Sequence, residues 1–186
     1  EAGEVFVRLR PRRPEDGLPV PLQIQVLEAD MVPANDSTAP NGNAIVQGIA
    51  PDEDFSQGVA LSVSQKHPGI VEDFEQYRAS ATPEPGGLWA WRNGAKPQIL
   101  SLFVRAASAD HRGKGKIEWV DKALVELRKF VQANQLKSIA LPKLGTGAGD
   151  LDWRDVKPLI EKHLGDLPTR VYLYTIFNPV IEGVED

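Results

Sequence analysis

A glycine-rich stretch near residue 145 holds the residues with the clearest capacity for chemistry. Residues 138–141 form a short apolar run typical of a strand, and the sequence Gly-Thr-Gly-Ala-Gly follows at 145–149. Asp152 then lies where a helix would begin. Glycines let the main chain approach an anion closely, and the N–H groups at a helix start point toward it. The spacing predicts a cradle for a phosphate or diphosphate, with a tight turn that binds nothing as the alternative.

Two common nucleotide motifs do not account for this stretch. A Walker A loop would end in Gly-Lys followed by Ser or Thr, which is missing after these glycines. The dinucleotide fingerprint G-x-G-x-x-G is also missing, and the glycines come late in the chain rather than after the first strand. The predicted anion site is therefore of another kind.

An acidic loop supplies a second group of candidate residues. Residues 50–58 read APDEDFSQG, so Asp52, Glu53 and Asp54 stand side by side. A carboxylate can activate water, and His111 can act as an acid or base near neutral pH. A phosphate pocket rarely needs three carboxylates nearby, which favours a chemical role for the run as a whole. For each single residue, a solvated loop side chain is the alternative.

Composition limits the class of protein. With 186 residues the chain has the length of one domain, and 41% hydrophobic and 25% charged residues are ordinary for a globular protein. The net charge of −5 argues against general nucleic-acid binding, because phosphate contacts would need a basic face. A specific nucleic-acid end could still be a substrate.

The same composition predicts neither a metal nor a cofactor. There is no cysteine, and the three histidines are scattered without the spacing of metal ligands. No apolar run approaches the ~20 residues of a membrane span, and no signal peptide is visible, so we expect no membrane partner and a cytoplasmic location. The sequence begins at Glu1 without Met, which is compatible with a piece of a longer protein.

Strands and helices alternate through the second half of the chain, which predicts an α/β sheet covered on both faces. Hydrophobic periodicity and turn residues place strands at residues 4–10, 22–27, 44–49, 88–91, 98–104, 138–141 and 170–177. The same signals place helices at residues 59–66, 70–78 and 116–134. A last helix follows Asp152, and Pro158 should delay its start or kink it.

Three separated motifs resemble the macrodomain family, an ADP-ribose-binding α/β/α module. The first is Asp30 at the end of a strand, the second is NAIVQGI followed by FSQGVALSVSQKHPG, and the third is LPKLGTGAGDLDWRDVKPLIEKHLGDL followed by VYLY. The third motif resembles the subgroup that contains terminal ADP-ribose glycohydrolases and DNA ADP-ribosyl glycohydrolase antitoxins. The resemblance implies a three-layer α/β/α fold with a central mixed sheet. It implies one domain over residues 1–186, with a core at about 22–177, an N-terminal strand and loop at 1–21 and a tail at 178–186.

The resemblance also implies a ligand, ADP-ribose or an ADP-ribosylated macromolecule, and a set of residues that hold it. Asp30 would accept from the adenine amino group, the helix start at Gly58 would hold the proximal phosphate, and the glycine loop would hold the other phosphate and the distal ribose. Tyr174 would lie near the adenine or proximal ribose, unless it is an ordinary core aromatic of its strand. The implied binding set is Asp30, Met31, Gln47, Gly58, Val59, Ala60, Gly145, Thr146, Gly147, Ala148, Gly149, Tyr174 and Phe177.

The catalytic residues of the subgroup are replaced here. Its lysine, which can attack C1″ of the ribose or stabilise charge there, corresponds to Arg105, and arginine stays protonated and is a poor nucleophile. Its acid in the glycine loop corresponds to Gly149, so it is absent unless the neighbouring Asp150 takes its place. Its first-loop asparagine has no clear equivalent, and Gln47 and Ala50 occupy that region. The candidates that remain for catalysis are Arg105, Asp52, Asp54 and His111.

The sequence therefore predicts ADP-ribose binding with hydrolysis of an ADP-ribosyl linkage on a protein, a nucleic acid or an ADP-ribose derivative. The alternative is a reader module that binds ADP-ribose without turnover. A third possibility is a divergent macrodomain that has lost the pocket and serves as an interaction surface.

Overall fold

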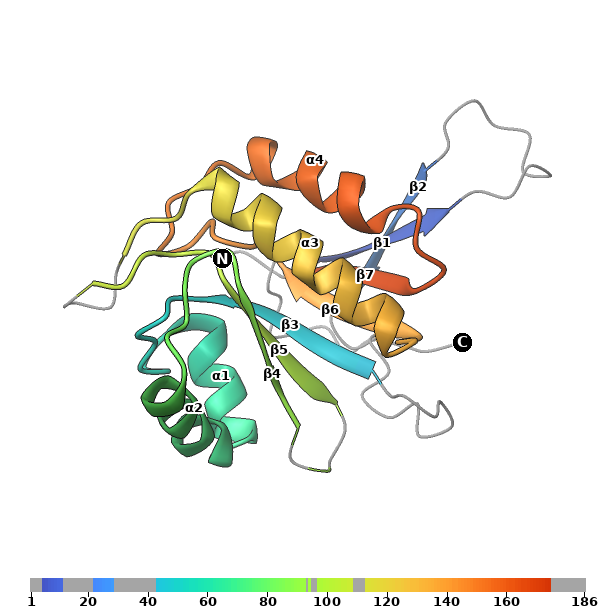
Figure 1. Cartoon of the computed structure of the whole chain (residues 1–186). Helices are drawn as coiled ribbons and strands as arrows, with labels where there is room; N and C mark the ends of the chain where they lie inside the picture. Colours follow the sequence, from blue (N-terminus) through green and yellow to red (C-terminus); the bar gives the residue numbers. More distant parts are fainter. Residues whose placement is uncertain are drawn as a thin grey trace.

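The computed structural model describes residues 5–11, 22–28, 43–92, 94, 97–108 and 113–174 (Figure 1). Within these ranges lie the strands β1 (Val5–Pro11), β2 (Leu22–Glu28), β3 (Asn43–Ile49), β4 (Leu88–Trp91), β5 (Gln98–Phe103), β6 (Ser138–Pro142) and β7 (Arg170–Tyr174). The helices are α1 (Gly58–Lys66), α2 (Gly69–Ser80), α3 (Ile117–Ala133) and α4 (Trp153–Leu164). The strands and helices expected from periodicity are confirmed, within a few residues at their ends.

The strands form one mixed sheet in the order β2-β1-β7-β6-β3-β5-β4. The four central strands β7, β6, β3 and β5 run parallel, with Ala44 of β3 opposite both Ile139 of β6 and Gln98 of β5. The outer strands β1 and β4 run antiparallel to their central neighbours. Because the central strands are parallel, their carboxyl ends lie at the same edge of the sheet.

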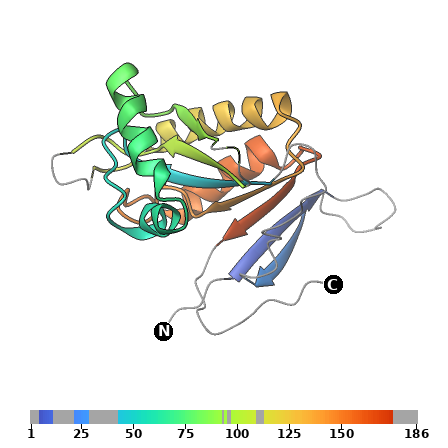
Figure 2. The ribbon, with the colours of Figure 1, turned by 90° about the horizontal axis from the view of Figure 1, so that it is seen from below.

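The helices cover the sheet on both faces, which completes three layers. Figure 1 shows α3 and α4 on one face and α1 and α2 on the other. Seen from below in Figure 2, α1 and α2 lie over the half of the sheet that holds β3, β5 and β4, while β1 and β2 form the opposite end. The predicted α/β/α architecture with a central mixed sheet is confirmed.

Each face has its own hydrophobic core. The core under α3 and α4 contains Val46, Leu100 and Leu141 from the sheet. The helix α3 adds Val120, Leu124, Leu127 and Val131, which recur at helical spacing and are all buried. The core under α1 and α2 is centred on Phe74.

Both tryptophans of the β4 strand belong to this second core. Trp89 and Trp91 are 9% and 4% exposed, so neither forms a contact patch on the surface. The indole nitrogen of Trp91 donates a hydrogen bond of 2.6 Å to the carboxylate of Asp73 on α2. This bond satisfies the polar end of a buried ring and fixes α2 against the sheet.

The last helix corrects one prediction and confirms another. Asp152 is its N-cap, and the Asp152 carboxylate accepts a hydrogen bond of 2.8 Å from the amide of Arg154. The helix begins at Trp153, directly after this cap, and Pro158 lies inside it, so a delayed start is wrong. Proline removes one N–H and crowds the carbonyl four residues earlier. The buried stripe of Val156, Ile160 and Leu164 holds the helix against the sheet across that position.

Among the described residues, none of the helices combines the length and the apolar character that crossing a bilayer requires.

Candidate functional site

The sheet topology creates a switch point between β3 and β6. These two parallel strands are neighbours, but the chain leaves β3 toward α1 on one face and leaves β6 toward α4 on the other. Such a switch point, outside the carboxyl ends of the strands, is where open α/β sheets bind ligands. Residues 50–57 and 143–152, which contain the acidic run and the predicted glycine loop, follow these two strands.

The loop after β6, residues 143–152, requires its glycines. Gly145 has a φ of +70° and Asp150 a φ of +58°, both in the left-handed region. A Cβ on Gly149 would overlap the carbonyl of Gly145, and the amide of Leu151 donates to that same carbonyl at 3.1 Å. The turn is therefore too tight for larger residues at Gly149.

This tight turn leaves main-chain donors available. Among the described residues, the amides of Gly147, Ala148 and Gly149 donate to no acceptor, and Gly147 and Ala148 are exposed. Successive unused amides in a turn form an anion-binding concavity. These are the amides that the predicted phosphate cradle would use, and anion binding by this loop stays a prediction.

The loop after β3 ends in a second group of amides. The first helical hydrogen bond of α1 runs from Leu61 to the carbonyl of Gln57 at 3.2 Å. The amides of Gly58, Val59 and Ala60 therefore have no partner within the helix, and no side chain caps them. Val59 is exposed to 45%, so this helix start faces open space rather than the core.

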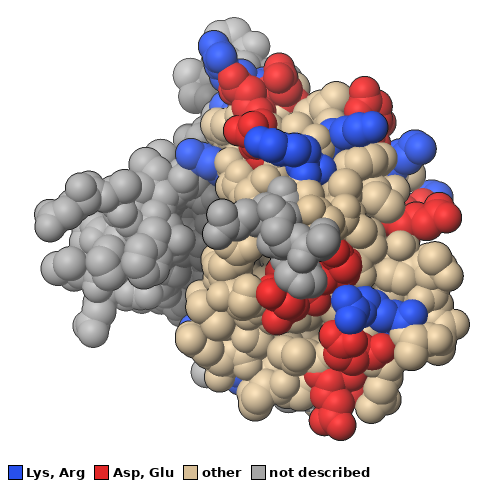
Figure 3. Space-filling model, turned by 90° about the vertical axis from the view of Figure 1, so that its left-hand side faces the viewer, with Lys and Arg blue, Asp and Glu red and all other residues tan. Residues whose placement is uncertain are grey.

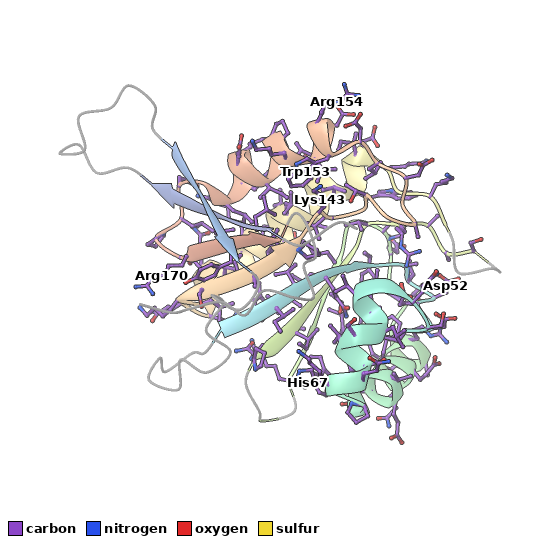
Figure 4. All side chains as sticks on the ribbon, turned by 180° about the vertical axis from the view of Figure 1, so that it is seen from behind. Asp52, His67, Lys143, Trp153, Arg154 and Arg170 are labelled. Carbon is purple, nitrogen blue, oxygen red and sulfur yellow. The ribbon has the colours of Figure 1, made fainter. Side chains whose placement is uncertain are left out.

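The glycine loop lies close to the end of β3. A Cβ placed on Gly48, near the end of β3, would lie 3.6 Å from the amide nitrogen of Gly145. Figure 4 shows Asp52 beside the start of α1, and Lys143 with Trp153 beside the start of α4. Figure 3 views the molecule from the side on which both loops lie, where acidic and basic side chains are interspersed. Two groups of main-chain donors thus follow the carboxyl ends of the neighbouring strands β3 and β6.

The three carboxylates of the first loop have different environments. Asp54 is exposed, and its carboxylate accepts from the amide of Ser56 at 2.9 Å within the loop. Asp52 is half-buried and accepts from the amide of Ser108 at 2.8 Å. Glu53 is 1% exposed and forms an ion pair with Arg105, which is 6% exposed.

Burial dominates the chemistry of Glu53. Desolvation raises the pKa of its carboxyl above the usual value, and the Arg105 guanidinium partly opposes this effect. One carboxylate oxygen, Oε2, meets Arg105 and lies 3.4 Å from the amide of Ala50, whereas Oε1 has no hydrogen-bond partner among the described residues. The sequence prediction treated Glu53 only as part of an acidic run and missed this pair. The available signal was the arginine at the lysine position, which needs a counter-charge when buried.

Arg105 also joins the glycine loop through the main chain. It forms an isolated bridge with Gly115, and the Gly115 amide donates to the carbonyl of Gly149 at 2.8 Å. Nearby, the Lys114 ammonium pairs with the carboxylate of Asp150 at 2.5 Å on the surface. The segment after β5 therefore lies against the turn that supplies the amide cradle.

Gln47 is placed inside the sheet rather than on an open surface. It is fully buried, and its side-chain amide donates to the hydroxyl of Ser101 at 2.9 Å across β3 and β5. Its carbonyl oxygen has no partner among the described residues. Tyr174 ends β7 opposite Pro142, and its side chain is not described. Four predicted site residues lie outside the described residues: Asp30, Met31, His111 and Phe177.

The sheet order, the helices on both faces and the two amide-lined loops define a macrodomain. The macrodomain of Mycobacterium tuberculosis DarG has a TM-score of 0.65 at 21% identity, over 75% of this chain and 92% of that one. A structure of Thermosipho africanus DarTG in complex with ADP-ribose has a TM-score of 0.65 at 18% identity, over 73% of this chain and 38% of that one. The predicted membership of the macrodomain fold is confirmed, with resemblance to the DarG subgroup.

Relatives known by sequence agree with this subgroup. A DNA ADP-ribosyl glycohydrolase of Thermus aquaticus is 28% identical over 132 residues, covering 70% of this chain and 37% of the relative. The ADP-ribose glycohydrolase OARD1 of Bos taurus is 22% identical over 137 residues, covering 74% of this chain and 84% of the relative. The chain spans less than two fifths of the length of the DNA ADP-ribosyl glycohydrolases that it matches.

A sequence model of the family described as "Phage portal protein, lambda family" matches over residues 1–140, and by that match the chain belongs to this family. The matched span ends inside β6 and leaves out the glycine loop, α4 and β7. A boundary inside a central strand does not delimit a folding unit. The likeness to the solved macrodomain of DarG covers 75% of this chain.

Proposed function

We propose that this chain binds ADP-ribose and hydrolyses an ADP-ribosyl linkage on a protein, a nucleic acid or an ADP-ribose derivative. The observation that carries the proposal is the pair of amide-lined loops on either side of the β3–β6 switch point. The names of the sequence relatives and the ADP-ribose complex of a structural neighbour support the choice of ligand.

The two loops would hold the ligand mainly by its diphosphate. The amides of Gly58, Val59 and Ala60 would bind the phosphate nearer the adenosine, and the residues Gly145–Gly149 would bind the other phosphate and the distal ribose. At the adenine end we propose Asp30 as the acceptor for the purine amino group, with the neighbouring Met31, Tyr174 and Phe177 lining the ring. Gln47 is the remaining member of the proposed set, and its buried side chain would act from within β3, where it donates to Ser101.

Hydrolysis would require a stabilised oxocarbenium-like centre at C1″ and an activated water. Arg105 is a weak candidate for direct attack, because guanidinium stays protonated and here pairs with Glu53. Asp52 is better placed than Asp54, since the Ser108 amide fixes its carboxylate while Asp54 turns back onto its own loop. We propose Asp52 as the residue that activates water, with Asp54 and His111 as the alternatives.

A reader function without turnover is the second candidate. It is favoured by the Glu53–Arg105 ion pair, which occupies the position of the subgroup's catalytic lysine with a side chain that cannot form the same adduct. ADP-ribose binding is common to both candidates, and only turnover separates them.

The proposal extends to the setting of the protein. Residues 1–186 would act as one macrodomain in the cytoplasm, where a cysteine-free sequence suits a reducing compartment. The net charge of −5 supports the absence of general nucleic-acid affinity. No membrane partner is proposed.

Calorimetry with ADP-ribose, followed by incubation with ADP-ribosylated protein and ADP-ribosylated DNA, tests this function. We expect binding that Asp30→Ala weakens, and release of free ADP-ribose from at least one substrate. Binding without release would leave the reader function. An absence of binding to ADP-ribose and to any adenine nucleotide would overturn both candidates and favour a macrodomain that has lost its pocket.

A further inference from the structure

The Glu53–Arg105 ion pair connects the segments that follow two neighbouring strands of the sheet, β3 and β5. Glu53 lies in the loop after β3, which leads to α1, and Arg105 follows β5. Both side chains are almost completely buried, at 1% and 6% exposure. Breaking such a pair by removing one partner leaves an uncompensated buried charge, so the two segments are held together strongly.

The connection continues from Arg105 to the glycine loop. The main chain of Arg105 bridges Gly115, whose amide donates to the carbonyl of Gly149 at 2.8 Å. The amide of Ala106 donates to the carbonyl of Lys114 at 2.9 Å. Residues 105–106 and 114–115 therefore pair as the two arms of a hairpin after β5. A continuous path of contacts therefore runs from the loop after β3, through the ion pair, to the glycine loop.

We infer that the Glu53–Arg105 pair is a positioning device, which sets the distance between the helix start of α1 and the glycine loop so that both can hold one diphosphate. Arg105 then acts through Gly115 and Gly149 and makes no contact with the reacting bond. This inference rests on the proposed ADP-ribose binding. It gives the arginine at the lysine position a different task from nucleophilic attack.

The inference predicts a change in ligand preference rather than a general loss of binding. ADP-ribose places one phosphate on each loop, whereas AMP has a single phosphate and needs only the loop at α1. If the spacing between the loops is disturbed, the protein should lose affinity for ADP-ribose and keep its affinity for AMP. If the pair only stabilised the fold, its loss would lower the fraction of folded protein, and the apparent affinities for both ligands would fall equally.

The experiment compares the dissociation constants of ADP-ribose and AMP by calorimetry in the wild type, Arg105→Met and Arg105→Lys. We expect Arg105→Met to raise the dissociation constant of ADP-ribose about tenfold or more and that of AMP less than about twofold. A tenfold change corresponds to about 1.4 kcal/mol of binding free energy. Arg105→Lys keeps a charge opposite Glu53 and should keep most of the preference. Arg128→Met is the control, because Arg128 pairs with Asp166 between α3 and the end of α4.

A double variant covers the case in which Arg105→Met fails to fold. Glu53→Gln with Arg105→Met removes both charges, which should restore folding but not the preference for ADP-ribose. A double variant that folds and prefers ADP-ribose as the wild type does would overturn the inference, as would an unchanged preference in folded Arg105→Met. If the wild type itself binds neither ligand, the proposed function fails before the pair is tested.

Discussion

The amide of Gly115 donates a hydrogen bond of 2.8 Å to the carbonyl of Gly149, and this bond ties the hairpin after β5 to the glycine loop. Gly149 is buried in that contact, while its neighbours Gly147 and Ala148 remain exposed. One side of the loop is therefore held by the protein, and the other side is left for a ligand.

Substitutions of two glycines should distinguish the side of the loop that the protein holds from the side that would face a ligand. Gly149→Ala would force a Cβ onto the carbonyl of Gly145, so we expect a loss of about 1–3 kcal/mol in the free energy of unfolding and weaker ADP-ribose binding. Gly147 has no atom near the position of a Cβ, so Gly147→Ala should change stability by less than about 0.5 kcal/mol. Urea denaturation and calorimetry check both variants. Loss of stability in Gly147→Ala would contradict the described loop.

Arg105→Lys tests the chemistry at the subgroup's lysine position. A lysine here would stay paired with the buried Glu53, so we expect it to keep its proton and not to attack C1″. The variant should release ADP-ribose no faster than the wild type, and mass spectrometry should detect no lysine adduct. A trapped adduct would contradict the positioning role of the pair. If Asp52 activates the attacking water in the wild type, Asp52→Asn should abolish hydrolysis of the ADP-ribosyl linkage. An unchanged rate in Asp52→Asn would remove that residue from the mechanism.

Glu53 should give the protein a measurable dependence of stability on pH. Its pKa is raised in the folded protein, so the carboxyl favours the folded state at low pH, and that contribution is lost as the pH rises through the raised pKa. The free energy of unfolding of the wild type, minus that of Glu53→Gln, should fall as the pH rises above 4.5, the usual pKa of a glutamate side chain. The opposite slope would mean that attraction to Arg105 outweighs burial.

Asp152 should show the reverse sign. Its hydrogen bonds to Arg154 lower the pKa of this exposed carboxyl to about 2. The charged form therefore stabilises the folded state above the usual pKa of 3.8, and the contribution disappears as the pH falls toward about 2. Asp152→Asn keeps an oxygen for the N-cap but loses the charge. Its melting temperature should lie below that of the wild type near neutral pH and converge with it in acid, which thermal denaturation at several pH values would show.

The second core should depend heavily on Phe74. This side chain is fully buried and its ring lies within 6.3 Å of the ring centres of Phe55, Trp89 and Phe103. Phe74→Ala should cost about 3–5 kcal/mol in the free energy of unfolding. Val59→Ala on the exposed start of α1 is a suitable control and should cost less than about 0.5 kcal/mol. Equal losses in both variants would show that the core is not centred on Phe74.

Local patterns were sufficient to predict most of the fold. The apolar spacing in α3 and the glycines after β6 are short-range signals, and the sequence carries them directly. The helix α4 continues through Pro158 although proline disfavours a helix interior. The packing of Val156 and Ile160 against the sheet outweighs that preference.

The interior of the site was harder to predict because it depends on contacts between distant residues. Glu53 and Arg105 are 52 positions apart, and nothing local distinguishes Glu53 from Asp52 or Asp54. Their burial follows only from the neighbouring positions of β3 and β5 in the sheet. Gln47 likewise fits a ligand role by its place in the sequence, whereas its bond to Ser101 arises from strand pairing.

An amide-resolved NMR titration with ADP-ribose would show whether main-chain amides of two loops hold one diphosphate. We expect the largest shifts to occur together at two groups of amides, Gly58, Val59 and Ala60 in one and Gly147, Ala148 and Gly149 in the other. Saturable binding that leaves either group of amides unshifted would contradict this mode of binding.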